Sequence, residues 1–151
     1  MTTLEQFMQD TLRKVPIEPI RLDPPVPIAS LPTPALVLDL DIFEHNLAKM
    51  QQHLQKHGMG LRGHTKMHKS PIIARKQIEN GALGVCAATV SEAEVMLAGG
   101  VDNILITSPV VTADKIGRVI AMATRSAEIR IVVDHINGAE KFNAAAEQAG
   151  V

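Results

Sequence analysis

Short runs of strand length alternate with amphipathic stretches along most of this chain. Five such runs recur at near-regular spacing, namely residues 35–40, 61–66, 83–87, 103–106 and 129–133. Each run precedes a stretch with apolar residues at helical spacing, and these stretches cover residues 41–57, 70–81, 91–100, 112–125 (or from Pro109) and 137–150. The pattern therefore predicts five consecutive βα units.

Residues that favour helix ends flank the expected helices. Asp41 and Ser70, which Pro71 follows, are placed to begin two of them, and residues 91–94 and 137–140 match capping boxes. Glycines close four of them, at Gly58, Gly81, Gly99 with Gly100, and Gly150. The buried stripe expected in the first helix consists of Ile42, Phe43, Leu47, Met50 and Leu54.

The expected strands are mostly continuous in apolar character rather than alternating. Strands of this kind are typical of a parallel sheet that is covered on both faces. Regular βα repetition, with no G-x-G-x-x-G turn after the first strand, favours a (β/α)8 TIM-type barrel over an open dinucleotide-binding sheet. Five units do not close such a barrel, so we expect an α/β fold that forms the N-terminal, incomplete part of one.

The first 34 residues have a different character. Residues 1–14 can form a short amphipathic helix, and residues 15–34 contain seven of the nine prolines in the chain. A segment so rich in proline forms neither a helix nor a central strand. We therefore expect a lead-in over residues 1–30 and a partial barrel over residues 31–151.

Composition and charge narrow the classes of function. The 151 residues are 46% hydrophobic and 21% charged, with a net charge of −1. This balance does not suggest nucleic acid or an anionic membrane as a partner. The single cysteine, Cys86, excludes an intrachain disulfide, and no apolar run is long enough to span a membrane. Without a signal-peptide core, a cytoplasmic location is expected.

One expected strand carries basic residues at alternate positions. Arg62, His64, Lys66 and His68 would share one face of an extended segment, because strand side chains alternate between faces. Such a face is poorly suited to a hydrophobic core. It is suited to binding an anion, or to an amine that attacks a carbonyl group.

In a barrel, functional side chains lie where strands end at their carboxyl side. That rule selects Asp39, residues 64–69, Ala88, Thr89, Thr107, Ser108, Asp134 and His135. An amine reacts only after it loses a proton, which burial and neighbouring cations favour. For Lys66 and Lys69, that reactive role and a simple solvated position at the strand end are both open.

Other polar residues have less specific interpretations. His64 and His68 could bind a metal, although no carboxylate or cysteine accompanies them. Asp39 and Asp134 could orient a cation or cap a helix, and Cys86 fits a buried strand position. The histidines of the first expected helix fit surface positions, at His45, His53 and His57.

Three segments resemble a known family. Residues 31–39, Leu-Pro-Thr-Pro-Ala-Leu-Val-Leu-Asp, resemble the opening of fold-type III pyridoxal-phosphate enzymes, the alanine racemase-like barrels. Residues 64–69, His-Thr-Lys-Met-His-Lys, are similar to the H-x-K-x-H-K signature of the D-threonine aldolase and D-serine dehydratase branch. Residues 84–86 and 90–94 resemble the next βα unit, as found in D-threonine and 3-hydroxy-D-aspartate aldolases.

The resemblance implies roles for particular residues. Lys66, rather than Lys69, is the expected Schiff-base lysine, and His64 is an expected cofactor-binding residue. Gly63 stands where many relatives have proline, and Ala88 where some aldolases have a glutamine that contacts the cofactor. The family's phosphate-binding residues, divalent-metal ligands and C-terminal β-domain are expected beyond Val151.

The implied activity is that of a pyridoxal-phosphate-dependent lyase. D-threonine would be cleaved to glycine and acetaldehyde through a Lys66 aldimine, with a divalent metal (Mn, Mg or Zn) orienting the hydroxyl group. The alternatives are D-serine dehydration to pyruvate and ammonia, a non-catalytic pyridoxal-phosphate carrier, and an inactive fragment. The resemblance also implies a small-molecule D-amino acid substrate and a homodimer at full length.

Overall fold

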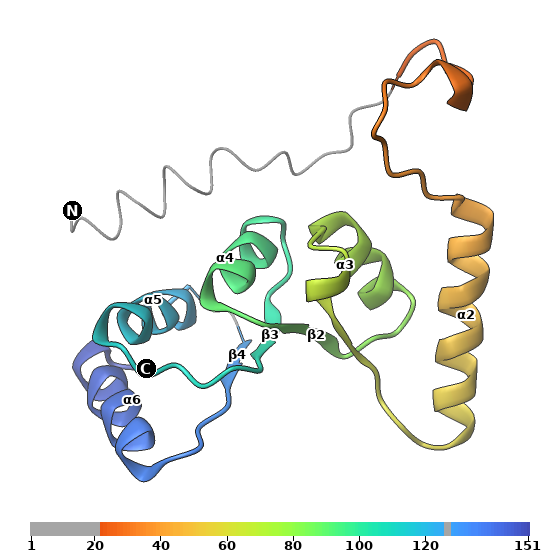
Figure 1. The fold of residues 1–151 in the computed structure, drawn as a ribbon. Coiled ribbons are helices and arrows are strands. Elements are labelled where there is room, and N and C mark those ends of the chain that lie inside the picture. The colour runs from red at the N-terminus through yellow and green to blue at the C-terminus, as the bar shows by residue number, and fades with distance from the viewer. Residues whose placement is uncertain (1–21, 126–127) are drawn as a thin grey trace.

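The computed structural model describes residues 22–125 and 128–151 (Figure 1). Four strands form one parallel sheet in chain order: β1 (Arg62–His64), β2 (Gly84–Ala87), β3 (Asn103–Ile106) and β4 (Glu128–Ile131). A helix follows each of them: α3 (Pro71–Glu79), α4 (Val90–Ala98), α5 (Ala113–Ala123) and α6 (Ile136–Ala149). Helix α2 (Leu40–Lys56) precedes β1, and short 3-10 turns form η1 (Ile28–Ser30) and η2 (Thr65–Met67). This is the expected α/β order of the N-terminal part of a TIM-type barrel.

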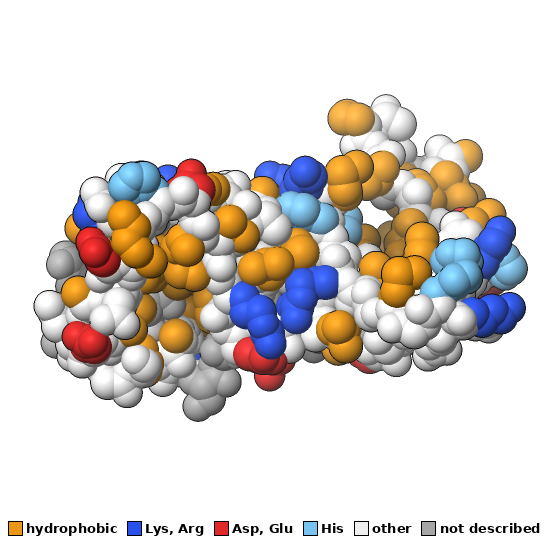
Figure 2. Space-filling model, turned by 90° about the horizontal axis from the view of Figure 1, so that it is seen from below, with side chains coloured by type: hydrophobic (Ala, Val, Ile, Leu, Met, Phe, Trp, Pro, Cys, Tyr) orange, Lys and Arg blue, Asp and Glu red, His pale blue; other side chains and the backbone are white. Residues whose placement is uncertain are grey.

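The helices and the sheet form two layers. Helices α3, α4 and α5 lie on one side of the strands, above them in Figure 1. The core between the layers consists of Ala74, Val85, Ala87, Val90, Ala93, Met96, Val101, Ile104, Ile106, Val110, Ile116, Val119, Met122 and Phe142. Figure 2 views the molecule from below, where basic side chains lie beside acidic ones among apolar groups. That face of the sheet corresponds to the interior of a barrel.

The strand register sets which side chains meet on the uncovered face. His64 pairs with Cys86, Cys86 with Leu105, and Leu105 with Arg130, so these four lie at one level across the sheet. Alternate residues such as Ile104 are 0% exposed and point to the helices instead. Thus β1 and β2 contribute His64 and Cys86 to the uncovered side near their carboxyl ends.

The prediction of a strand over residues 35–40 is wrong. Residues 35–39 have no regular secondary structure, and Leu36 is fully exposed while Val37 and Leu38 are 49% exposed. A strand needs a hydrogen-bonded neighbour, and β1 pairs only with β2 among the described residues. The apolar run predicted a strand, but the described residues contain no strand that pairs with residues 35–39.

Helix α2 also differs from the expectation. None of its residues is buried, and Ile42 and Met50 of the expected stripe are 60% and 50% exposed. Its contacts with the following unit are polar. Gln51 Nε2 donates to the backbone oxygen of Gly81 at 3.1 Å, and Lys76 Nζ lies 3.0 Å from Glu44 Oε1.

Three helix caps lie upstream of the expected residues. Asp39, rather than Asp41, caps α2 by accepting from the N–H of Ile42 at 3.0 Å. Thr89 caps α4, and His135 caps α6. In each case a residue with extended backbone directly before the helix supplies the side-chain acceptor. The expected cap at Ser70 with Pro71 in the first turn is confirmed.

The N-terminal expectations are tested only in part. The expected helix over residues 1–14 lies outside the described residues. In the described part of the proline-rich segment the only regular element is η1, and two X-Pro bonds, Asp23–Pro24 and Thr33–Pro34, are cis. None of the helices that the structure describes is long and apolar enough to cross a membrane.

Candidate active site

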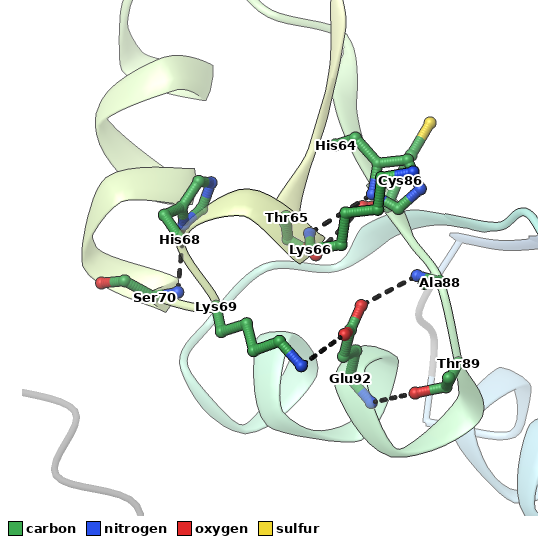
Figure 3. A network of polar contacts seen from close by, with 10 residues as sticks. All are labelled: His64, Thr65, Lys66, His68, Lys69, Ser70, Cys86, Ala88, Thr89 and Glu92. Carbon is green, nitrogen blue, oxygen red and sulfur yellow. Dashed lines mark hydrogen bonds and ion pairs between the residues drawn. The ribbon is translucent and has the colours of Figure 1, made fainter.

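The chain leaves β1 at His64 and immediately makes the turn η2, which carries Lys66 (Figure 3). The expected strand over residues 61–66 therefore runs two residues too far at its carboxyl end, and Lys66 does not continue its alternation. The hydroxyl of Thr65, a residue that is 0% exposed, donates to the Cys86 carbonyl at 3.0 Å and anchors the turn to β2. Met67 is 82% exposed. Local hydrogen bonds thus override the extended conformation that spacing predicted.

His64 joins the ends of three strands. Its Nδ1 accepts from the Lys66 N–H at 3.3 Å, which bends the backbone into the turn. Its Nε2 lies 3.2 Å from Thr107 Oγ1, and that hydroxyl is 3.2 Å from the Ala87 carbonyl. Thr107, which the position at a strand end selected, therefore contacts His64 and the Ala87 carbonyl.

His68 repeats the hydrogen bond of His64 one turn later. Its Nδ1 accepts from the Ser70 N–H at 3.0 Å, directly before α3. Burial lowers the pKa of His68, against the opposing effects of its hydrogen bond with Ser70 and of the Gln77 side chain. Its Nε2 and the Oε1 of Gln77 are both buried, and neither atom has a hydrogen-bond partner among the described residues. Burial therefore disfavours the charged form of His68, and its contact with the Ser70 N–H joins the turn to the start of α3.

Lys69 is held by a carboxylate from the next unit. Its Nζ lies 3.1 Å from Glu92 Oε1, and Glu92 Oε2 accepts from the Ala88 N–H at 2.9 Å (Figure 3). Burial opposes ionisation of Glu92, but the Ala88 hydrogen bond, the Lys69 ion pair and the nearby His64 together lower its pKa. Lys69 also adopts a left-handed backbone with φ of 52°, which L-residues rarely do.

Lys66 differs from Lys69 in its surroundings. Both side chains are exposed, so the burial expected for a reactive lysine is not found in this part of the chain. Among the described residues, however, the Lys66 ammonium makes no hydrogen bond or ion pair, whereas Lys69 is engaged by Glu92. Of the two lysines, Lys66 has the amine that is available for chemistry.

Arg62 belongs to a separate polar group at the start of the strands. Its Nη1 donates to Asn103 Oδ1 at 2.6 Å, and Arg130 donates to the same oxygen at 2.9 Å. Glu128 pairs with Arg130 and accepts from Asn103. Arg62 and His64 share one face of β1, as alternation predicted. The Arg62 side chain, however, joins a group at the amino end of β3 and β4 rather than the Lys66 turn.

The remaining candidates have structural positions. Cys86 is partly buried, and burial raises the pKa of its thiol, partly offset by Arg62. Asp39 and His135 are helix caps, while Ser108 and Asp134 are exposed. Within residues 22–125 and 128–151, no group of three or more His, Cys, Asp or Glu side chains is placed to bind a metal.

Glu92 is a site residue to which the sequence pattern assigned no role. The pattern Ser91 to Glu94 was interpreted as the capping box, yet the cap is Thr89, which accepts from the Glu92 N–H at 3.2 Å. Thr89 to Glu92 also matches the capping-box spacing. Ser91 instead accepts a hydrogen bond from Arg118 at 3.0 Å. The sequence did contain the correct capping box, because Thr89 to Glu92 matches the motif two residues before the match at Ser91 to Glu94.

The comparison with protein families agrees with this geometry. Residues 38–151 match the model of the alanine racemase N-terminal domain. The chain belongs to this family. Its members are fold-type III pyridoxal-phosphate enzymes, which confirms the resemblance drawn from the sequence.

Individual relatives of this domain are aldolases and a dehydratase. The chain is 38% identical to the D-threonine aldolase of Arthrobacter sp. over 142 residues, which is 94% of this chain and 37% of that protein. It is 37% identical to the 3-hydroxy-D-aspartate aldolase of Paracoccus denitrificans over 81% of the chain and 32% of that protein. The D-threo-3-hydroxyaspartate dehydratase of Delftia sp. is 32% identical over 82% of the chain and 32% of its own length.

A solved structure supports the fold. The crystal structure of D-threonine aldolase from Filomicrobium marinum superposes with a TM-score of 0.79 and 42% identity, over 82% of this chain and 33% of that one. The chain therefore spans about a third of the length of the relatives that it matches.

Proposed function

We propose that this domain belongs to a pyridoxal-phosphate-dependent lyase that acts on D-3-hydroxy amino acids and that Lys66 is the residue to which the cofactor is attached. The observation that carries the proposal is the difference between the two lysines of the turn. Lys66 has no polar partner among the described residues, and Lys69 is held 3.1 Å from Glu92. A covalent anchor requires an amine that is free to react.

The residues of the turn fit such a cofactor. Lys66 lies just beyond the carboxyl end of β1, where barrel enzymes carry their functional groups. His64 lies beside it and presents a ring that could contact the cofactor, although Thr107 and the Lys66 N–H already occupy both of its nitrogens. We propose His64 as a contact through its ring rather than through a further hydrogen bond.

The chain's own residues would hold the anchor in place. The Thr65 hydroxyl fixes the turn to β2, and the His64 imidazole holds the Lys66 backbone N–H. The ion pair with Glu92 engages the ammonium of Lys69 and leaves that of Lys66 to react. Pyridoxal phosphate, when bound, supplies an electron sink for bond cleavage at the α-carbon of an amino acid.

Aldol cleavage of D-threonine is the proposed reaction because the aldolases among the relatives carry that chemistry in their names. Divalent-metal dependence is part of the proposal only for a longer protein. The described residues contain no group of three or more side chains that could hold a divalent metal ion. We therefore assign no metal ligand to this domain.

The test for Lys66 compares two neighbouring lysines. The protein is incubated with pyridoxal phosphate and reduced with borohydride, which makes the attachment permanent, and peptide mapping by mass spectrometry locates it. We expect attachment at Lys66 in the wild type and in Lys69→Ala, and loss of the visible absorbance band in Lys66→Ala. Attachment that survives in Lys66→Ala but is lost in Lys69→Ala would contradict the assignment.

Dehydration is the second candidate function, and the relationship to the D-threo-3-hydroxyaspartate dehydratase favours it. The products separate the two reactions. Aldol cleavage of D-threonine releases an aldehyde and glycine, whereas dehydration of a D-3-hydroxy amino acid releases ammonia and a 2-oxo acid. We expect the aldehyde from the longer protein with D-threonine, and ammonia release without aldehyde would favour the dehydratase.

A further inference from the structure

We infer that Thr107 is a positioning residue for Lys66, because its hydroxyl fixes the His64 tautomer that holds the Lys66 backbone. The inference rests on the proposed role of Lys66 and extends it to the end of β3. Thr107 lies 41 residues further along the chain than Lys66. Among the described residues no hydrogen bond joins its side chain to Lys66, and its link to the turn runs through the imidazole of His64.

The direction of each hydrogen bond follows from the donors involved. The Lys66 backbone nitrogen can only donate, so His64 Nδ1, 3.3 Å away, carries no hydrogen. A neutral imidazole then carries its hydrogen on Nε2, which lies 3.2 Å from Thr107 Oγ1. The Thr107 oxygen accepts this hydrogen and donates its own to the Ala87 carbonyl at 3.2 Å. In this series, the Lys66 N–H, the His64 Nε2–H and the Thr107 hydroxyl each donate to one acceptor.

The opposite tautomer does not fit this arrangement. A hydrogen on Nδ1 would face the Lys66 N–H, which is a contact between two donors. Thr107 favours the Nε2–H state because its hydroxyl, when it donates to the Ala87 carbonyl, presents an acceptor to Nε2. The backbone N–H of Thr107 also donates to the Ala87 carbonyl at 2.9 Å, so the threonine is anchored to β2 by two hydrogen bonds to the same oxygen.

The orientation of Lys66 depends on its backbone. Because the side chain has no polar partner among the described residues, the turn alone sets the direction in which it leaves the chain. Besides backbone hydrogen bonds to the Thr65 carbonyl, two side-chain contacts hold that turn, the Thr65 hydroxyl on the Cys86 carbonyl and the His64 ring on the Lys66 N–H. The second of them is the one that Thr107 controls.

The matched variants are Thr107→Val, which keeps the branched shape without the hydroxyl, and Thr107→Ser, which keeps the hydroxyl. The first measurement needs no cofactor: ¹⁵N NMR of the imidazole reports the His64 tautomer, and hydrogen exchange reports the Lys66 amide. We expect the wild type and Thr107→Ser to show the Nε2–H form with a protected amide. We expect Thr107→Val to show mixed tautomers and faster exchange at Lys66, by roughly three- to tenfold for one lost neutral hydrogen bond.

The second measurement is the rate at which pyridoxal phosphate attaches to the protein. We expect attachment to slow in Thr107→Val and to be restored in Thr107→Ser. An unchanged tautomer in Thr107→Val overturns the inference, and so does an altered tautomer with an unchanged attachment rate. If Thr107→Val does not fold, Thr107→Ala takes its place under the same criteria. If Lys66 takes no cofactor in the wild type, the proposed function and the positioning role for attachment both fail, and the NMR result decides the His64 contact separately.

Discussion

Glu92 Oε1 lies 3.1 Å from Lys69 Nζ, and this ion pair connects the turn after β1 with the start of α4. The same carboxylate accepts from the Ala88 N–H, so it organises two loops at the carboxyl ends of neighbouring strands. The backbone of Lys69 is left-handed, with a φ of 52°. A lysine in that conformation is under strain that glycine would not have.

Two substitutions at Lys69 separate the effect of backbone strain on stability from the effect of losing the ion pair. Lys69→Ala and Lys69→Gly both lose the contact with Glu92, but only the glycine variant relieves the left-handed backbone. We expect Lys69→Gly to be more stable than Lys69→Ala by about 1 kcal/mol in denaturant unfolding. Equal stability of the two variants would show that the backbone is not strained at this position.

The ion pair also predicts a pH dependence. Glu92 has a folded-state pKa below its ordinary value of 4.5, so its stabilising effect is complete above that pH. As the pH falls through the lower folded-state pKa, the native carboxylate takes up a proton and the effect is lost. We expect the difference in unfolding free energy between wild type and Glu92→Gln to be constant above pH 4.5 and to shrink below it. A difference that is flat through this acid range would contradict the pairing.

His68 predicts a second titration at higher pH. Burial lowers its folded-state pKa below 6.5, so the unfolded chain takes up a proton first as the pH falls. We expect the stability of the wild type to fall relative to His68→Asn as the pH decreases from 6.5. Asparagine keeps an acceptor for the Ser70 N–H but does not titrate. Parallel stability curves for the two proteins over that range would show that His68 is not the group responsible.

Gly84 is required for the polar group at the start of the strands. Its φ is 151°, and an added Cβ would overlap the Asn103 backbone oxygen and crowd the Arg62 guanidinium. We expect Gly84→Ala to destabilise the protein by about 2 kcal/mol through this overpacking. Gly117→Ala, in α5 with nothing within 4 Å of the new methyl group, is the control, and we expect it to stabilise the helix by about 1 kcal/mol. Thermal unfolding of the two variants measures both effects.

Two ion pairs differ in their burial. Arg118 Nε lies 2.8 Å from Glu94 Oε1, and the two side chains are 13% and 5% exposed. The pair of Arg130 with Glu128 is about half exposed. We expect Glu94→Ala to destabilise the protein by about 3 kcal/mol, because it removes the nearer and more buried of the two carboxylates that face the Arg118 guanidinium. We expect Glu128→Ala to lower stability by less than about 1 kcal/mol in the same unfolding assay.

Much of this domain follows from local pattern. Apolar runs and helix-end residues predicted four of the strands and every helix of the described part after residue 39, because burial and capping act over a few residues. The prediction of a strand at residues 35–40 was wrong because a strand also needs a neighbouring strand to pair with, and the apolar run does not specify that neighbour. Alternation failed at Lys66, where the contacts of Thr65 and His64 bend the chain. The links from Glu92 to Lys69 and from Thr107 to His64 join separate βα units, and no local pattern predicts them.

The sheet order β1-β2-β3-β4 follows the order of the chain. Each strand therefore finds its partner in the unit made next, and no segment has to wait for a distant one before it can pair. Short-range pairing of this kind keeps the entropy of loop closure low and allows assembly during synthesis, which proceeds at about 5–20 residues per second. The Lys66 turn gains its contact with Cys86 when β2 has formed and its link to Thr107 when β3 has formed. By that stage the ribosome has to release only about two thirds of this chain.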